Sequence, residues 1–198
     1  MGKNKLKKFN DIAQMDCVVE CPFAMLSDEG FPMRGKWNET FFKNKGKIVL
    51  ELGCGKGEYT VGLARRYPEC NFIGIDIKGA RLWTGAKEVT SCNIPNAAFL
   101  RTTIDLLPKF FAPSEVSEIW ITFPDPQMKK ENKRLTGTRF MELYRRVLAP
   151  GAMIKLKSDS QFLYEYTLAM AAHNGITVAQ SSHDLHNDPS APDELKQI

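Results

Sequence analysis

Three glycines and two acids are the residues of this sequence best suited to chemistry. Gly53, Gly55 and Gly57 follow an apolar run that contains Glu51, and Asp76 ends the next apolar run. Glycines at this spacing let the backbone take positive φ angles and let a ligand approach it closely. A carboxylate at the end of the second strand can accept hydrogen bonds from both hydroxyls of a ribose. The pattern therefore predicts a nucleoside site.

The charges around the glycines narrow the choice of nucleoside. A dinucleotide fingerprint needs a third glycine where this chain has Glu58. The acid before the first glycine, Glu51, suits a cationic ligand better than a pyrophosphate. S-adenosylmethionine carries an ammonium and a sulfonium centre, so it is the expected cofactor. A tight turn without a ligand is the alternative.

A second motif, Phe123-Pro124-Asp125-Pro126, follows a later apolar run. The two prolines hold the backbone extended and fix the direction of the acid between them. Such a motif is typical of enzymes that methylate nitrogen atoms, which makes Asp125 the candidate catalytic residue. The alternative is a rigid loop whose acid caps the next turn.

Basic residues gather in two segments, although the net charge is only +4. Clusters of this kind often contact phosphates, but a solvated face is an equally good interpretation at this stage. The first segment lies at the N-terminus (Lys3, Lys5, Lys7, Lys8) and the second follows the proline motif (Lys129, Lys130, Lys133, Arg134, Arg139).

The hydrophobic pattern predicts alternating strands and helices after an extended, basic N-terminal arm of residues 1–40 that packs on a domain of residues 41–198. A helical turn is expected at 38–42. Strands are expected at 47–52, 71–76, 97–101, 118–123, 152–157 and 176–181, and helices at 58–67, 79–92, 106–111, 139–148 and 162–173. This order predicts an α/β fold, a doubly wound, mostly parallel sheet with helices on both faces.

Polar residues follow the strand ends of this predicted sheet. Ligands of such sheets bind outside the carboxyl ends of the strands. Convergence at that edge is expected for Glu51, the three glycines, Asp76, Thr102, Thr103, Asp125 and Asp159.

Composition excludes several other classes of protein. The chain has 198 residues and 43% hydrophobic content, enough for one α/β domain with a core. It has neither an apolar run long enough to span a membrane nor an apolar leader. Its five cysteines lack zinc-ligand spacing and are expected as free thiols in the cytoplasm, and no metal is expected.

Taken together, three motifs of this chain resemble the bacterial tRNA (guanine-N7)-methyltransferase family. They are the Glu51–Gly57 run, the run ending at Asp76, and the Phe123–Pro126 motif with the lysines that follow it. The resemblance covers roughly residues 45–185. It implies a Rossmann-like class I methyltransferase that modifies guanosine 46 in the variable loop of tRNA. It also implies tRNA as partner, with the protein a monomer or a homodimer.

The resemblance assigns roles to particular residues. Lys129 and Asp159 match substrate-contacting positions, and Arg134 of the basic cluster is expected to contact the substrate through its phosphates. The expected cofactor contacts are Glu51, Gly53, Gly55, Gly57, Asp76, Ile77, Thr102, Thr103, Ile104 and Asp125.

Four features depart from the family pattern. Gln127 and Met128 stand where tryptophan and proline are common, and Thr103 stands where an acid is usual. Glu131 and Asn132 interrupt the basic stretch, where members often have histidine. The chain ends at Ile198 without the family's Thr-x-x-Glu motif, so we expect its C-terminal strand to be missing. The alternatives are a methyltransferase for another substrate and a non-catalytic, cofactor-binding RNA-binding subunit.

Overall fold

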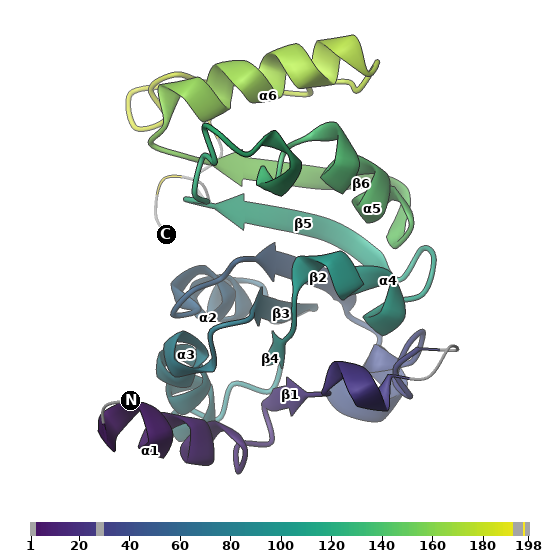
Figure 1. The fold of residues 1–198 in the computed structure, drawn as a ribbon, viewed down its shortest axis with the longest axis vertical. Coiled ribbons are helices and arrows are strands. Elements are labelled where there is room, and N and C mark those ends of the chain that lie inside the picture. The colour runs from purple at the N-terminus through teal and green to yellow at the C-terminus, as the bar shows by residue number, and fades with distance from the viewer. Residues whose placement is uncertain (1–2, 27–29, 192–195, 197–198) are drawn as a thin grey trace.

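A computed structural model describes residues 3–26, 30–191 and 196, and its sheet is parallel throughout (Figure 1). Six strands lie in the order β1-β4-β3-β2-β5-β6. Because all strands run the same way, their carboxyl ends meet at one edge of the sheet. The strands are β1 (Val18–Glu20), β2 (Lys47–Leu52), β3 (Cys70–Asp76), β4 (Ala97–Arg101), β5 (Val116–Thr122) and β6 (Leu148–Lys157).

Helices cover both faces of the sheet, as a fully parallel sheet requires. Alternate residues of β2 show this: Leu50 packs in one core with Phe140 of α5, while Val49 packs in the other with Leu63 of α2. The sheet is thus buried from both sides, and its carboxyl edge remains available for a site. The helices are α1 (Lys3–Ile12), α2 (Glu58–Arg66), α3 (Gly79–Ser91), α4 (Leu107–Phe110), α5 (Thr138–Arg145) and α6 (Gln161–His173).

The central elements lie where the sequence pattern predicts them. Strands β2 and β4 have the predicted bounds, and the helical turn at 38–42 is present as a π-helical turn. The parallel register places Glu51 of β2 beside Gly74 of β3 and Trp120 of β5. The predicted α/β fold with a parallel sheet is therefore confirmed.

The prediction of an extended arm over residues 1–40 is wrong in its secondary structure. Residues 3–12 form α1, which packs on α3, and residues 18–20 form β1, which extends the sheet beside β4. Trp37 is completely buried and donates its indole N–H to the Phe110 carbonyl at 2.9 Å. The few apolar residues of α1 gain their helical order from packing against α3, a tertiary effect that periodicity does not reveal.

The prediction at the last strand pair is also partly wrong. Pro150 and Gly151 lie inside β6, an edge strand of the described sheet that tolerates a proline, and do not end the preceding helix. The predicted strand at 176–181 is absent, because residues 176–180 pair with no described strand and Ile176 and Val178 stay 40% and 45% exposed. No helix in the described part of the chain is both long and apolar enough to cross a membrane.

Candidate active site

The glycine turn between β2 and α2 leaves its backbone open where a ligand would approach. Gly53 and Gly55 have φ angles of 72° and 57°, which a side chain would strain. A Cβ atom at Gly55 would have its nearest neighbour 4.0 Å away, so nothing fills the space in front of it. Gly57 has another role, because a Cβ atom there would collide with the Phe99 ring at 2.5 Å. Gly53 and Gly55 therefore form the cradle, and Gly57 allows helix α2 to pack closely.

Asp76 ties this turn to the end of β3. One carboxylate oxygen accepts the Gly55 backbone N–H at 3.1 Å, and the other accepts that of Lys78 at 2.8 Å. The side chain is 9% exposed, so its orientation is fixed and its desolvation is already compensated. A carboxylate oxygen has two lone pairs, so each can still accept a ribose hydroxyl.

Glu51 is the buried acid of the site. Its Oε2 accepts hydrogen bonds from both the backbone N–H of Thr60, at 2.8 Å, and the Thr60 hydroxyl, at 2.5 Å. Its Oε1 accepts one from the Thr122 hydroxyl at 2.7 Å. Burial raises the pKa of Glu51 to about 7, against the opposing effect of these hydrogen bonds. A cation placed beside Glu51 would favour the charged carboxylate and lower this pKa.

The second motif follows β5 and lies next to Glu51, the buried acid beside the glycine turn. Thr122, which donates to Glu51, immediately precedes Phe123, whose φ of 44° is strained for a residue with a side chain. Asp125 is exposed, and its Oδ1 accepts the backbone N–H of Gln127 at 3.0 Å. Asp125 thus caps the following turn, as the structural alternative predicted, yet its carboxylate still faces solvent at the carboxyl edge.

An aromatic pair and a lysine lie beside this motif. The Phe123 ring is 52% exposed, and its centroid is 6.3 Å from that of Tyr59 on α2. The Lys157 ammonium at the end of β6 lies 5.3 Å from the Tyr59 ring and 5.6 Å from the Phe123 ring, within cation–π range. Partial burial lowers the pKa of Lys157. An exposed ring next to a cation is a suitable surface for stacking a nucleobase.

Comparison with known proteins decides the family. A family profile described as "Putative methyltransferase" matches residues 45–196. The tRNA (guanine-N(7)-)-methyltransferase of Porphyromonas gingivalis (strain ATCC BAA-308 / W83) is 58% identical over 91% of this chain and 75% of its own length. That of Bacteroides fragilis (strain YCH46) is 53% identical over 98% of this chain and 77% of its own length. This chain belongs to the tRNA (guanine-N7)-methyltransferase family.

Solved structures agree with the fold expected of this family. A structure titled "Structure of an antibiotic related Methyltransferase" superposes with a TM-score of 0.58 at 18% identity, covering 72% of each chain. Likeness at this identity concerns the fold alone. It confirms the Rossmann-like class I methyltransferase architecture predicted from the sequence.

The remaining residues predicted to contact the cofactor lie along the same edge. Ile77 directly follows Asp76 and is 56% exposed, so it offers an apolar surface to a ligand held by that acid. Thr102 is buried just after β4, whereas Thr103 and Ile104 are partly buried at the start of the next turn. Thr103 stands where the family usually has an acid. Asp105, the acid in the same turn, does not replace it, because its carboxylate pairs with Arg139.

The predicted substrate residues fall into two kinds. Lys129 and Asp159 are exposed near the ends of β5 and β6, free to meet a substrate. Arg134 is instead only 3% exposed, and its guanidinium donates to backbone carbonyls of its own loop. This geometry does not support the predicted phosphate contact by Arg134.

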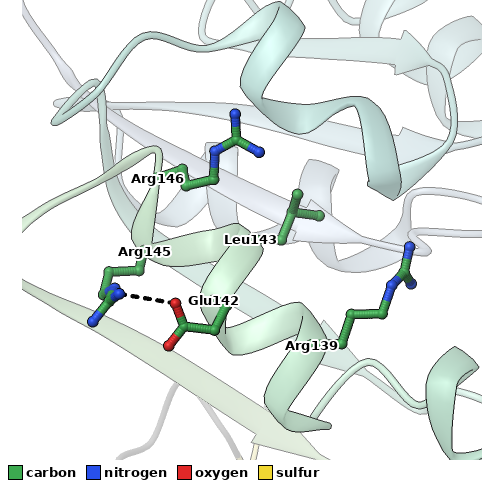
Figure 2. A pocket seen from close by; sticks show the side chains of 5 residues that line it. All are labelled: Arg139, Glu142, Leu143, Arg145 and Arg146. Carbon is green, nitrogen blue, oxygen red and sulfur yellow. Dashed lines mark ion pairs between the residues drawn. The ribbon is translucent and has the colours of Figure 1, made fainter.

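Two arginines of α5 and the arginine directly after this helix border a shallow hollow, but the charge of the hollow is largely compensated. Figure 2 shows Arg139, Arg145 and Arg146 around Leu143 on this helix. Arg145 pairs with Glu142 at 2.9 Å, and Arg139 pairs with Asp105. Two of the three charges are thus neutralised, so the hollow is a weak electrostatic attractant for an anion.

Sequence reasoning missed the residues that hold the site together. Thr60 and Thr122 fix Glu51, and Tyr166 of α6 contacts Arg134. The parallel register of β2 and β5 could have indicated Thr122, because Leu52 pairs with Ile121, the residue before it. No sequence signal links Tyr166 to Arg134. No cluster of three potential metal ligands occurs among the residues that the structure describes.

Proposed function

We propose that this protein transfers the methyl group of S-adenosylmethionine to N7 of a guanine in tRNA, at position 46 of the variable loop. The observation that carries the proposal is the 2.7 Å hydrogen bond from Thr122 to Glu51. It joins the glycine cradle to the Phe123–Pro126 motif, so one edge holds both a nucleoside-type site and an exposed acid. Family membership supplies the substrate, since the relatives act on guanine N7 of tRNA by name.

S-adenosylmethionine fits the residues of the cradle. Open backbone at Gly53 and Gly55 accommodates a close ligand, Asp76 can accept from ribose hydroxyls, and Glu51 favours a cationic group. When bound, the cofactor supplies an electrophilic methyl group. The two carboxylates are buried before it binds, so little reorganisation is required of the protein.

For this reaction the protein must position the guanine against the methyl group and stabilise positive charge, and it needs no general base. N7 of guanine has an in-plane lone pair without a proton, so no side chain has to remove one. Methylation leaves positive charge on the base, which a nearby carboxylate stabilises. Asp125 is an exposed acid at that edge, within the Phe123–Pro126 motif, and takes this role, either directly or by accepting from the N1–H and amino group of the guanine.

The substrate approaches from the exposed side of the second motif. RNA bases are read when they are splayed from the stack and laid against aromatic rings. The half-exposed Phe123 ring offers such a surface, and the exposed Lys129, Lys130 and Lys133 can bind RNA phosphates. The five cysteines are free thiols, which agrees with a cytoplasmic enzyme.

The test is methyl transfer to bulk tRNA, followed by nucleoside digestion and mass spectrometry. The expected product is 7-methylguanosine, formed in a tRNA with guanosine at position 46 and not in the same tRNA with adenosine there. Another methylated nucleoside would indicate a different substrate atom. Cofactor binding without any transfer would favour the non-catalytic alternative.

A further inference from the structure

Arg134 stands out from the other basic residues of the structure. It is 3% exposed and is the one basic side chain that is buried among residues 6–26, 30–191 and 196, whose burial the structure describes. Arginine is rarely buried unless its donors are paired. Its partners therefore show what it does.

The guanidinium of Arg134 spreads over three consecutive carbonyls of the preceding loop. Nε donates to the Pro126 carbonyl at 3.0 Å, while Nη2 donates to that of Gln127 at 3.1 Å and reaches that of Met128 at 3.4 Å. These three residues directly follow Asp125. One planar cation thus fixes the backbone that carries the candidate catalytic acid.

Two aromatic rings of α6 hold the same guanidinium from the other side. Its central carbon lies 4.0 Å from the Tyr166 ring centroid and 4.8 Å from that of Phe162. The Tyr166 hydroxyl also donates to Glu131 at 2.9 Å, which binds the far end of the loop to α6. Figure 1 shows this loop between β5 and α5, with α6 close above it. Arg134 therefore connects the loop to a regular helix.

Few other described bonds hold the part of this loop beside Asp125. Pro124 and Pro126 have no N–H to donate, and the Met128 side chain is 67% exposed. Apart from Arg134, the backbone beside Asp125 is held by the bond from the Phe123 N–H to the Lys157 carbonyl at 2.8 Å, by the cap on Gln127 and by the bond from the Lys130 N–H to the Gln127 carbonyl at 3.0 Å. Bonds from Arg139, Tyr144 and Tyr166 hold the later part of the loop, residues 131–135. An exposed loop with so few bonds would sample several conformations without the guanidinium.

We infer that Arg134 is a positioning residue that fixes Asp125 in its working orientation, and that it contacts no RNA phosphate. The inference rests on the proposed methyl transfer. A phosphate would have to enter a buried site and displace three carbonyls and two rings. Lysine cannot replace this arginine, because an ammonium lacks the planar fork that spans several carbonyls and stacks on rings.

The two roles make opposite predictions for Arg134→Lys and Arg134→Gln. If Arg134 positions the loop, both variants lose the fork, and both slow single-turnover methylation at saturating tRNA and cofactor. We expect a loss of roughly 10- to 100-fold, the size associated with a misplacement of about 1 Å. If Arg134 meets a phosphate, the charge-preserving Arg134→Lys retains most of the rate.

Salt dependence separates the roles a second time. Removing one phosphate contact lowers the slope of log affinity against log salt by about 1. We expect Arg134→Gln to leave the slope at the wild-type value, whereas Lys129→Ala lowers it. The matched control is Arg145→Lys, the same exchange at a side chain that is 78% exposed and paired only with Glu142. It should change neither the rate nor the slope.

Amide hydrogen exchange tests the clamp without any turnover. The amides of residues 127–134 should exchange faster in Arg134→Lys than in wild type or Arg145→Lys, with the melting temperature recorded for each. Unchanged exchange, a wild-type rate in Arg134→Lys, or a lowered slope in Arg134→Gln would each overturn the inference. A wild-type enzyme that makes no 7-methylguanosine would instead overturn the proposed function, and exchange would still decide whether Arg134 holds the loop.

Discussion

The two halves of the candidate site are built in different ways. In the cofactor half, Glu51 and Asp76 are 4% and 9% exposed. A backbone N–H of α2 and two threonine hydroxyls hold Glu51, and backbone N–H groups of Gly55 and Lys78 hold Asp76. In the substrate half, Asp125 is exposed, and the guanidinium of Arg134 binds the three backbone carbonyls that directly follow it.

This difference teaches how each half can be damaged. The cofactor half depends on strand ends and backbone hydrogen bonds, which single surface changes leave intact. The substrate half depends on fewer contacts beside Asp125, so one substitution there can displace this candidate catalytic acid. We therefore expect the two halves to fail separately, one in cofactor affinity and the other in methyl-transfer rate.

The largest expected effect is that of Asp125→Asn. Asparagine keeps the cap, because its carbonyl can still accept the Gln127 N–H, but it removes the charge. The single-turnover methylation rate should fall by roughly 10²-fold or more, as for loss of a preorganised electrostatic partner. Rapid-quench methyl transfer at saturating tRNA and cofactor measures it. If the variant transfers methyl at the wild-type rate, Asp125 serves to cap the turn and has no role in catalysis.

A smaller effect is expected from Asp76→Ala, in the other half. Losing the carboxylate leaves buried N–H groups and ribose hydroxyls unpaired, at a cost of roughly 1–3 kcal/mol in cofactor binding. Calorimetry with S-adenosylmethionine should show the corresponding loss of affinity. Binding of NAD by the wild type in the same experiment would contradict the assignment of the cofactor.

A third effect concerns the pH dependence of stability through Glu51. Its pKa is raised from 4.5 to about 7 by burial, so the folded protein binds more protons than the unfolded chain in this window. The stability that Glu51 contributes is fully present below pH 4.5 and is lost as the pH rises through 7, at up to about 1.4 kcal/mol per pH unit. The isosteric Glu51→Gln mimics the protonated form and should lack this loss.

Urea unfolding of the cofactor-free proteins between pH 5 and 7.5 tests this prediction. As the pH rises, the free energy of unfolding of Glu51→Gln should increase relative to that of wild type. Parallel curves for the two proteins would show that Glu51 is already charged in the free enzyme.

The two halves also differ in how far the sequence predicts them. Strand ends and glycines follow from local patterns, so the cradle and the positions of Glu51 and Asp76 could be predicted. The role of Arg134 could not, because its ring partners lie on α6, about thirty residues later, and a basic run looks the same whether solvated or buried. Likewise β1 joins the sheet through pairing with β4, which no periodicity in residues 1–40 reveals.

The most direct test of separable halves measures both cofactor affinity and single-turnover rate in Asp76→Ala and Asp125→Asn. We expect Asp76→Ala to lose cofactor affinity while retaining most of its rate at saturating cofactor. Asp125→Asn should retain cofactor affinity within a few-fold while its rate falls by roughly 10²-fold or more. If both variants lose both quantities to the same extent, the cofactor and substrate halves form a single unit, and the division described above is wrong.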